Sequence, residues 1–253
     1  MKKLSTRRNF IRAATALSAS MVPLSSLAEG TAQGQASRLK VVCVGGHPDD
    51  PESGCGGTLA KFSKAGHVVK VWYLTRGEAG IEGKSHREAA EIRTKEAEAA
   101  CKLLNVTPEF LGQVDGDTIF NTLWVNKMTD LLDTEQPDIV FAQWPVDSHK
   151  DHQVSGLLTI QARLRVKKKF QLYFYEVCAG EQTMSFHPTD YVDITTTQEI
   201  KRAALYCHVS QDPPSIYACG HELMELFRGR ESGVKAAEAF IKFTGGAASH
   251  DLI

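Results

Sequence analysis

Two short segments of the chain concentrate imidazole and carboxylate side chains. The first, HPDD, contains His47, Asp49 and Asp50, and the second, DSHKDH, runs from Asp147 to His152. Carboxylates that lie together raise one another's pKa, because each disfavours the charged form of its neighbour, unless a cation offsets the repulsion. A divalent metal ion would do so. The two segments together therefore predict a metal site.

The residue types favour an open, catalytic site. Two imidazoles and one carboxylate, with water in the remaining position, are usual ligands of a catalytic zinc ion. We assign His47, Asp50 and His152 as the ligands. The same set accepts Fe²⁺ and other divalent ions, so the sequence does not decide between zinc and iron.

The other side chains of the two segments have the chemistry that amide hydrolysis needs. Asp49 is the candidate general base, because a carboxylate that is not a ligand can take a proton from water. His149, protonated and held by Asp151, would stabilise the oxyanion of a tetrahedral intermediate. Asp147 and Glu52 are expected to orient the ligand imidazoles.

Each segment alone has a simpler interpretation. HPDD also fits a helix-capping turn in which the aspartates accept backbone N–H bonds, and HxDH alone is equally ambiguous. The surrounding elements favour the metal site. Short runs of β-branched and aromatic residues alternate with helical patterns, which predicts a mainly parallel sheet flanked by helices. The expected strands are Leu39–Val44, Val68–Thr75, Asp138–Ala142 and Gln171–Val177, and the expected helices are Gly57–Lys64, His86–Leu104, Asn121–Glu135 and His152–Val166.

The two segments follow the first and third of these strands directly. In an open parallel sheet, ligands bind beyond the carboxyl ends of the strands, where loops from several strands meet. HPDD and the Asp147–His152 segment are therefore expected at one rim of the sheet. The glycine-rich loop Gly77–Ser85 borders that rim and is a candidate lid.

The second half of the chain is less regular. After Val177 we expect irregular or hairpin structure that includes Tyr191–Ile194, and then helices at Gln198–His208 and His221–Arg228. Repeats and low-complexity linkers are absent from the sequence, which favours one domain over residues 38–253. Cys207 and Cys219 could close a loop as a disulfide, whereas Cys43 and Cys178 lie in apolar runs typical of buried free thiols.

The N-terminus has the features of an export signal. Residues 1–28 combine a basic start, an apolar middle and a small-residue end that resembles a cleavage site. Within them TRRNFIR, Thr6–Arg12, resembles a twin-arginine signal. We expect export by the twin-arginine machinery to the periplasm or the exterior, a flexible leader at residues 29–37, and no stable membrane insertion after cleavage. An ordinary secretory signal or a short anchor is the alternative.

The charge of the mature chain argues against a nucleic-acid partner. Residues 1–28 contain five of the 29 basic side chains and no acidic one, so cleavage leaves 24 basic against 30 acidic groups, a formal charge of −6. Arg163–Lys169 is the one dense basic run in the sequence, and it fits a solvated helix end better than a phosphate site. An anionic partner is not expected.

Four segments resemble the PIG-L or LmbE-like family of zinc-dependent N-acetylglucosaminide deacetylases. They are HPDDPESGCGGT, TRGEAG, RTKEAEAACKLLNV and PVDSHKDH, with CHVSQ at Cys207–Gln211 as a further match. The resemblance implies a Rossmann-like α/β fold and the same ligands, base and oxyanion histidine as above. Pro51 departs from the family's usual small residue at this position.

The resemblance also implies an activity and two further site residues. The family removes acetyl from the 2-acetamido group of a GlcNAc-type sugar or glycoconjugate. Arg93 matches a family arginine that would contact substrate, although a structural ion pair with its Glu neighbours is equally open, and His208 would line the pocket. Hydrolysis of another amide or an ester is the enzymatic alternative. A non-catalytic sugar-binding protein is the alternative outside enzymes, but Asp49 and His149, which it would not need, are both present.

Overall fold

A computed structural model of the protein describes residues 38–177 and 181–245. The expected signal peptide at 1–28 and leader at 29–37 lie outside these residues and stay predictions, as does the role of Cys178. Within the described residues, no helix combines the length and the apolar character that crossing a membrane requires.

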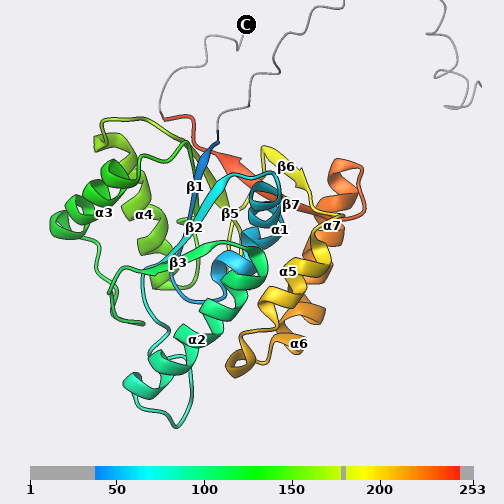
Figure 1. Cartoon of the computed structure of the whole chain (residues 1–253), viewed down its shortest axis with the longest axis horizontal. Coiled ribbons are helices and arrows are strands. Elements are labelled where there is room, and N and C mark those ends of the chain that lie inside the picture. The colour runs from blue at the N-terminus through cyan, green and yellow to red at the C-terminus, as the bar shows by residue number, and fades with distance from the viewer. Residues whose placement is uncertain (1–37, 178–180, 246–253) are drawn as a thin grey trace, which may run out of the picture. The chain divides into compact units, whose positions relative to one another are not determined.

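The described strands form one mainly parallel sheet, as predicted. Their order is β3-β2-β1-β4-β5-β7-β6 (Figure 1). The first five in this order are parallel to one another, and β7 is antiparallel to both β5 and β6. The strands are β1 Lys40–Gly45, β2 Val68–Tyr73, β3 Thr107–Phe110, β4 Ile139–Gln143, β5 Gln171–Tyr175, β6 Asp190–Asp193 and β7 Ala237–Lys242.

Helices connect the strands and continue after β6. The prediction for α2 is confirmed to the residue, with Ser85 and Glu88 forming a reciprocal cap at its start and Asn105 ending it in the left-handed conformation. The α-helices are α1 Asp50–Lys64, α2 His86–Leu104, α3 Thr122–Glu135, α4 Lys150–Arg165, α5 Gln198–Leu205, α6 Pro213–Ile216 and α7 Glu222–Ser232. A short 3-10 turn, Val209–Gln211, and a π-helical segment, Tyr217–His221, lie on either side of α6.

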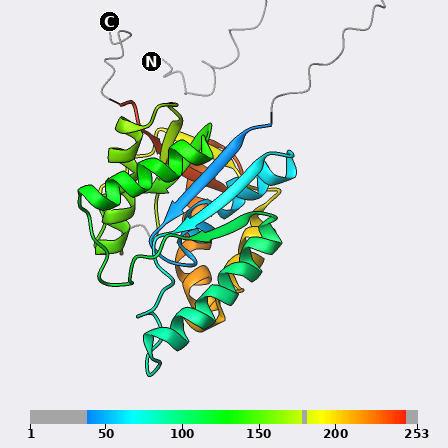
Figure 2. The same ribbon diagram turned by 60° about the vertical axis from the view of Figure 1, so that its left-hand side comes forward.

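The alternation of side chains along the strands builds a core on each face of the sheet. In β1, Val42 and Val44 face α3 and α4, whereas Val41 and Cys43 face α1 and α2. Figures 1 and 2 show these two helix pairs on opposite sides of the sheet. Since both faces are covered, β1 is apolar along nearly its whole length, as parallel strands usually are.

The order of the strands places the two predicted segments side by side. From β1 the chain continues to β2 and β3 on one side and then returns to β4 on the other side of β1. The loops after β1 and β4 therefore leave the sheet in opposite directions and open a crevice between them. His47–Asp49 lie in the first loop, directly before Asp50 at the start of α1, and Asp147–His149 lie in the second.

The prediction for the start of α1 is wrong. We expected the helix to begin at Gly57, but it begins at Asp50, with Pro51 in its first turn where a missing N–H costs little. The glycines serve close packing: a Cβ on Gly54 would lie 2.2 Å from Cδ2 of Tyr175. The glycine-rich stretch is therefore helix packed against the sheet rather than a turn.

The strand near Tyr191 does not belong to a local hairpin. β6 pairs with β7, more than forty residues later in the chain, and β7 in turn pairs with β5. Neither β3 nor β7 was expected from the sequence. Cys207 is a free thiol, so the disulfide left open for this residue is not formed.

A buried ion pair network holds the C-terminal elements against α1. Lys201 is 1% exposed, and its ammonium lies 2.9 Å from Glu225 and 2.7 Å from Glu238. Glu238 also accepts hydrogen bonds from the backbone N–H groups of Gly57 and Thr58. The network thus joins α5, α7, β7 and α1 around one buried cation.

We predict that Lys201→Met destabilises the fold by about 3–5 kcal/mol, because it leaves two buried carboxylates without their cation. Urea unfolding followed by circular dichroism measures this change. Lys95→Met, the same substitution on the exposed face of α2, should change the free energy of unfolding by less than about 0.5 kcal/mol. Equal effects of the two substitutions would contradict the assigned role of Lys201.

Candidate metal centre and its pocket

The three expected ligands come from the two crevice loops and the helices that follow them. His47 leaves β1, Asp50 begins α1, and His152 lies in the first turn of α4. All three side chains are buried. The backbone N–H of His47 donates to Oδ2 of Asp50 at 2.7 Å, which ties the loop to the start of α1.

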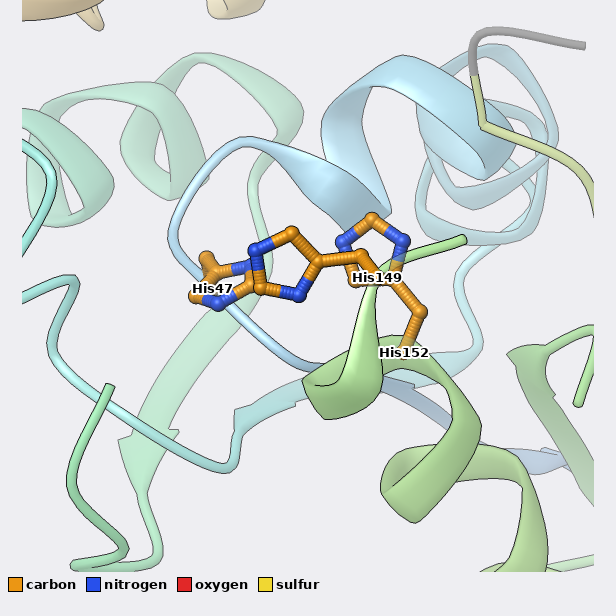
Figure 3. Close-up of side chains that lie close together, drawn as sticks. All are labelled: His47, His149 and His152. Carbon is orange, nitrogen blue, oxygen red and sulfur yellow. The ribbon is translucent and has the colours of Figure 1, made fainter. Parts of the chain in front are cut away.

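The carboxylate of Asp50 lies between two imidazoles. Its Oδ2 is 3.2 Å from Nδ1 of His47, and its Oδ1 is 3.3 Å from Nε2 of His152. Figure 3 shows the rings of His47 and His152 gathered with that of His149. HPDD and HxDH therefore lie together around Asp50, as the sequence predicts.

The outer nitrogen of each imidazole faces a carboxylate. Nδ1 of His152 is 3.2 Å from Oδ1 of Asp147, and Nε2 of His47 is 3.0 Å from Oδ2 of Asp151. A carboxylate at this position fixes the tautomer and aims the inner nitrogen at a metal ion. The nitrogen and oxygen donors around Asp50 therefore fit a divalent ion such as zinc, and Asp147 contacts His152 at the position from which it would orient the ring.

Two sets of side chains that include His47 have donor atoms close enough together to bind one metal ion. Donor atoms of His47, His149 and His152 lie within 4.8 Å of one another, and so do those of His47, Asp115 and Asp151. Asp115 is 3.1 Å from Nε2 of His47 and was not predicted. It lies in the loop after β3, so recognition of that strand would have marked it as a candidate.

The carboxylates change the protonation of this cluster. Burial lowers the pKa of His152, but Asp50 and Asp147 outweigh it and raise that pKa to about 9. Burial likewise raises the pKa of Asp50, but His152 and His47 hold it well below its usual value. At neutral pH the carboxylates therefore favour protonated imidazoles. A divalent ion that bound the imidazole nitrogens would displace these protons and supply the positive charge in their place.

Asp49 is held in a strained conformation. Its φ of 101° lies outside the region that a non-glycine residue normally adopts, and strain of this kind is found at functional sites. Its side chain does not cap α1. Instead Oδ2 accepts a hydrogen bond of 2.7 Å from Nη2 of Arg93. The capping interpretation of HPDD thus fails for Asp49.

Arg93 contacts the candidate base. Besides Asp49, its Nη2 donates to the carbonyl oxygen of Pro48. Arg93 is 3% exposed, and Cβ atoms on Gly77 and Gly80 would lie 2.6 Å from its Cδ and 2.5 Å from its Nη1. The ion pair left open by the sequence exists, but its partner is Asp49 and not a neighbouring glutamate. Burial raises the pKa of Asp49, and the charge of Arg93 opposes that shift.

The expected link between His149 and Asp151 is made by the backbone. Nδ1 of His149 accepts the N–H of Asp151 at 3.2 Å, while the Asp151 carboxylate accepts from Gly116 and Thr118 and faces His47. His149 precedes α4 and Asp151 lies within it, so their side chains diverge. Burial and the neighbouring imidazoles lower the pKa of His149. Because Nδ1 accepts from Asp151, Nε2 is the nitrogen of this ring that is placed to donate.

Glu52 does not orient a ligand imidazole, contrary to expectation. It is fully buried and accepts a 2.5 Å hydrogen bond from Tyr73, and its Oε1 lies 3.3 Å from Nε2 of His208. Because α1 begins at Asp50, residues 50 and 52 point in different directions. Burial lowers the pKa of His208, but Glu52 outweighs it and raises that pKa.

The three expected ligands line one pocket of about 390 Å³ together with Asp49 and His149, and this size is within the range of small-molecule sites. His208 and Arg93 both line it, as expected from the sequence. So do Ala79 and Gly80 of the candidate lid, where the carbonyl of Gly80 accepts a 3.0 Å hydrogen bond from Gln211. Closure of this loop stays a prediction.

Comparison with known proteins points to one family. The PIG-L profile, described as GlcNAc-PI de-N-acetylase, matches residues 42–163. Diacetylchitobiose deacetylase of Thermococcus kodakarensis is 31% identical over 83% of this chain and 85% of its own length. The 4-oxalmesaconate hydratase of Pseudomonas putida is 25% identical over 67% of this chain and 72% of its own length.

A solved structure agrees with this result. The N,N'-diacetylchitobiose deacetylase from Pyrococcus horikoshii, complexed with its inhibitor MPG, superimposes with a TM-score of 0.74 at 30% identity. The match covers 85% of this chain and 88% of that one.

We predict that Asp147→Asn weakens zinc binding about 10- to 100-fold, because it removes the carboxylate that orients His152. Competition with a chromogenic chelator measures the dissociation constant. Asp117→Asn is the matched control, since Asp117 is 84% exposed in the nearby loop. A zinc affinity unchanged by Asp147→Asn would contradict the assigned arrangement.

Proposed function

Because the chain belongs to the PIG-L family of de-N-acetylases, we propose that it hydrolyses the acetamido group of an N-acetylated amino sugar or glycoconjugate and that zinc serves the reaction. One observation carries the proposal. His47, Asp50 and His152 converge beside the ion pair of Asp49 and Arg93, inside a pocket of sugar-sized volume.

Zinc held by His47, Asp50 and His152 would polarise the acetamido carbonyl and the attacking water. Fe²⁺ or another divalent ion would be held by the same donors. The outer carboxylates, Asp147 and Asp151, keep both imidazoles aimed at this position.

The remaining residues transfer the proton, orient the base and stabilise the developing negative charge. Asp49 accepts a proton from the attacking water and returns it to the leaving amine. Arg93 orients the Asp49 carboxylate and favours its ionised form. Nε2–H of His149 donates to the oxygen on which negative charge develops. Each role uses a side chain that lines the same pocket.

Two alternatives use the same pocket. Hydrolysis of another amide or of an ester would need the same base and donors, and the hydratase relative shows water addition on a related chain. A non-catalytic sugar-binding protein is disfavoured by Asp49, because a strained conformation held by a buried arginine has no use in binding alone.

We also propose that the twin-arginine segment Thr6–Arg12 directs export to the periplasm or the exterior. Arg7→Lys together with Arg8→Lys should abolish export and leave the full-length chain in the cytoplasm, as cell fractionation and immunoblotting would show. Lys2→Arg together with Lys3→Arg controls for changed basic residues. Continued export of the double-lysine variant would favour an ordinary secretory signal.

We expect the mature protein to release primary amine from N,N'-diacetylchitobiose or GlcNAc. Chelation should abolish the release and added zinc should restore it. A fluorogenic amine assay with parallel detection of acetate measures the reaction. Amine release that survives complete removal of metal would overturn the metal dependence. Ester or amide cleavage without sugar deacetylation would favour the alternative hydrolase.

The same assay tests the base. Asp49→Asn should lower kcat by about 10²–10⁴ while zinc content stays at the wild-type level, because Asp49 is not a ligand. His152→Ala should lose both zinc and activity. A kcat of Asp49→Asn equal to that of the wild type would show that Asp49 is not the general base.

A further inference from the structure

We propose that two buried threonines, Thr118 and Thr183, are positioning residues for the metal centre, because each fixes the carboxylate that orients one of the two ligand imidazoles. The inference rests on the metal centre of the proposed function and adds two residues that lie outside both of its sequence motifs. Neither threonine lines the pocket, so each acts through an aspartate.

Thr183 holds the carboxylate of Asp147. Oδ1 of Asp147 faces Nδ1 of His152 and also accepts the backbone N–H of His149 at 2.8 Å. Oδ2 accepts the hydroxyl of Thr183 at 2.9 Å. This hydroxyl accepts the N–H of Val177 and lies 2.9 Å from the carbonyl oxygen of that residue, but its one proton favours the carboxylate, which is the stronger acceptor.

A short antiparallel bridge places Thr183 opposite Asp147. Backbone hydrogen bonds of 3.0 Å on either side of the bridge join residues 146–148 to residues 182–184. Residues that pair directly across antiparallel strands turn their side chains to the same face. The segment after β5 is therefore tied to the loop after β4 at the carboxylate that orients a ligand imidazole.

Thr118 holds the carboxylate of Asp151 in the same manner. Oδ2 of Asp151 faces Nε2 of His47 and accepts the backbone N–H of Gly116 at 2.8 Å. Oδ1 accepts the hydroxyl of Thr118 at 2.5 Å. Each orienting carboxylate thus uses one oxygen for its imidazole and a backbone N–H, and the other oxygen for a threonine.

The loop after β3 presents Gly116 and Thr118 to Asp151 because the side chain of Gln113 closes it. Oε1 of Gln113 accepts the N–H of Ile119 at 2.6 Å, and the amide nitrogen donates to the carbonyl oxygen of Ile119 at 3.3 Å. Gly116 has a φ of 77°, which glycine adopts at little cost. The backbone N–H and the hydroxyl therefore reach the same carboxylate from one closed loop.

The threonines matter because both carboxylates are buried. Asp147 is 3% exposed and Asp151 is 0% exposed. Among the described residues, the threonine is the one hydrogen-bond donor to the second oxygen of each carboxylate. Loss of the hydroxyl would leave that oxygen without a partner where water does not reach it, at a cost that favours rotation of the carboxylate. The imidazole that the carboxylate faces would then lose its orientation, and metal binding would have to restore it.

The test measures zinc affinity rather than turnover. Thr118→Val and Thr183→Val each replace the hydroxyl with a methyl group of nearly equal size. We expect each variant to raise the zinc dissociation constant about three- to tenfold, less than loss of the carboxylate itself, as competition with a chromogenic chelator would show. Thr118→Ser and Thr183→Ser keep the hydroxyl and should stay within about twofold of the wild type.

Thr159→Val is the matched control for a lost buried hydroxyl. Thr159 is fully buried in α4, and its hydroxyl donates to the carbonyl oxygen of Ser155 at 2.8 Å and not to a carboxylate. This variant should leave the zinc dissociation constant unchanged, even where it lowers the urea midpoint of unfolding. Circular dichroism verifies that each variant is folded. At a position where valine prevents folding, Thr→Ala removes the same hydroxyl and is measured instead.

The results separate this inference from the proposed function. Zinc binding as tight in both valine variants as in the wild type would overturn the inference, and an unchanged dissociation constant at one position would overturn the role of that threonine. Equal losses in the valine and serine variants, or an equal loss in Thr159→Val, would also overturn it, because they would indicate a general effect on the fold. A wild-type protein that does not bind zinc in this assay would overturn the metal centre as well.

Discussion

The contact of Asp50 with two imidazoles is the constraint on which the site depends. His47 and His152 lie 105 residues apart in the chain, and they meet because β1 and β4 are neighbours at the point where the strand order reverses. Asp147 and Asp151 then fix the outer nitrogens of the two rings. The result is a concentration of carboxylates that folding tolerates because imidazolium charge, or a divalent ion, compensates it.

Much of this arrangement follows from local sequence signals. Strands β1, β2, β4 and β5 are apolar runs, and α2 has a capping box and an amphipathic pattern, so their bounds were predictable within a few residues. Because loops meet at the carboxyl ends of parallel strands, the positions of HPDD and HxDH after β1 and β4 are sufficient to predict that they lie together. This rule alone places the side chains of Asp49, Asp50 and His152 at the same edge of the sheet.

The rest depended on tertiary contacts that sequence patterns do not contain. Gly54 lies before the expected helix start at Gly57, but its missing side chain makes room for Tyr175 within α1. Because the helix begins at Asp50, Glu52 points toward Tyr73 and His208 and not toward the ligand imidazoles. β3 has only four residues, so the sequence did not predict it or the position of Asp115 in the loop that follows it. β7 pairs with β6 across more than forty residues of chain, so this pairing was not predicted either. The direction of the Asp151 side chain was likewise set by Gly116 and Thr118 rather than by its neighbour His149.

The assignment of His47, Asp50 and His152 as metal ligands can be tested by anomalous diffraction from crystals of the zinc-loaded mature protein, recorded on both sides of the zinc absorption edge. We expect one strong peak about 2.0–2.2 Å from a nitrogen of His47, a nitrogen of His152 and a carboxylate oxygen of Asp50, with Asp49 outside the ligand sphere. A peak bound by other residues, such as Asp115 and Asp151 without Asp50, or no peak in the pocket, would contradict it.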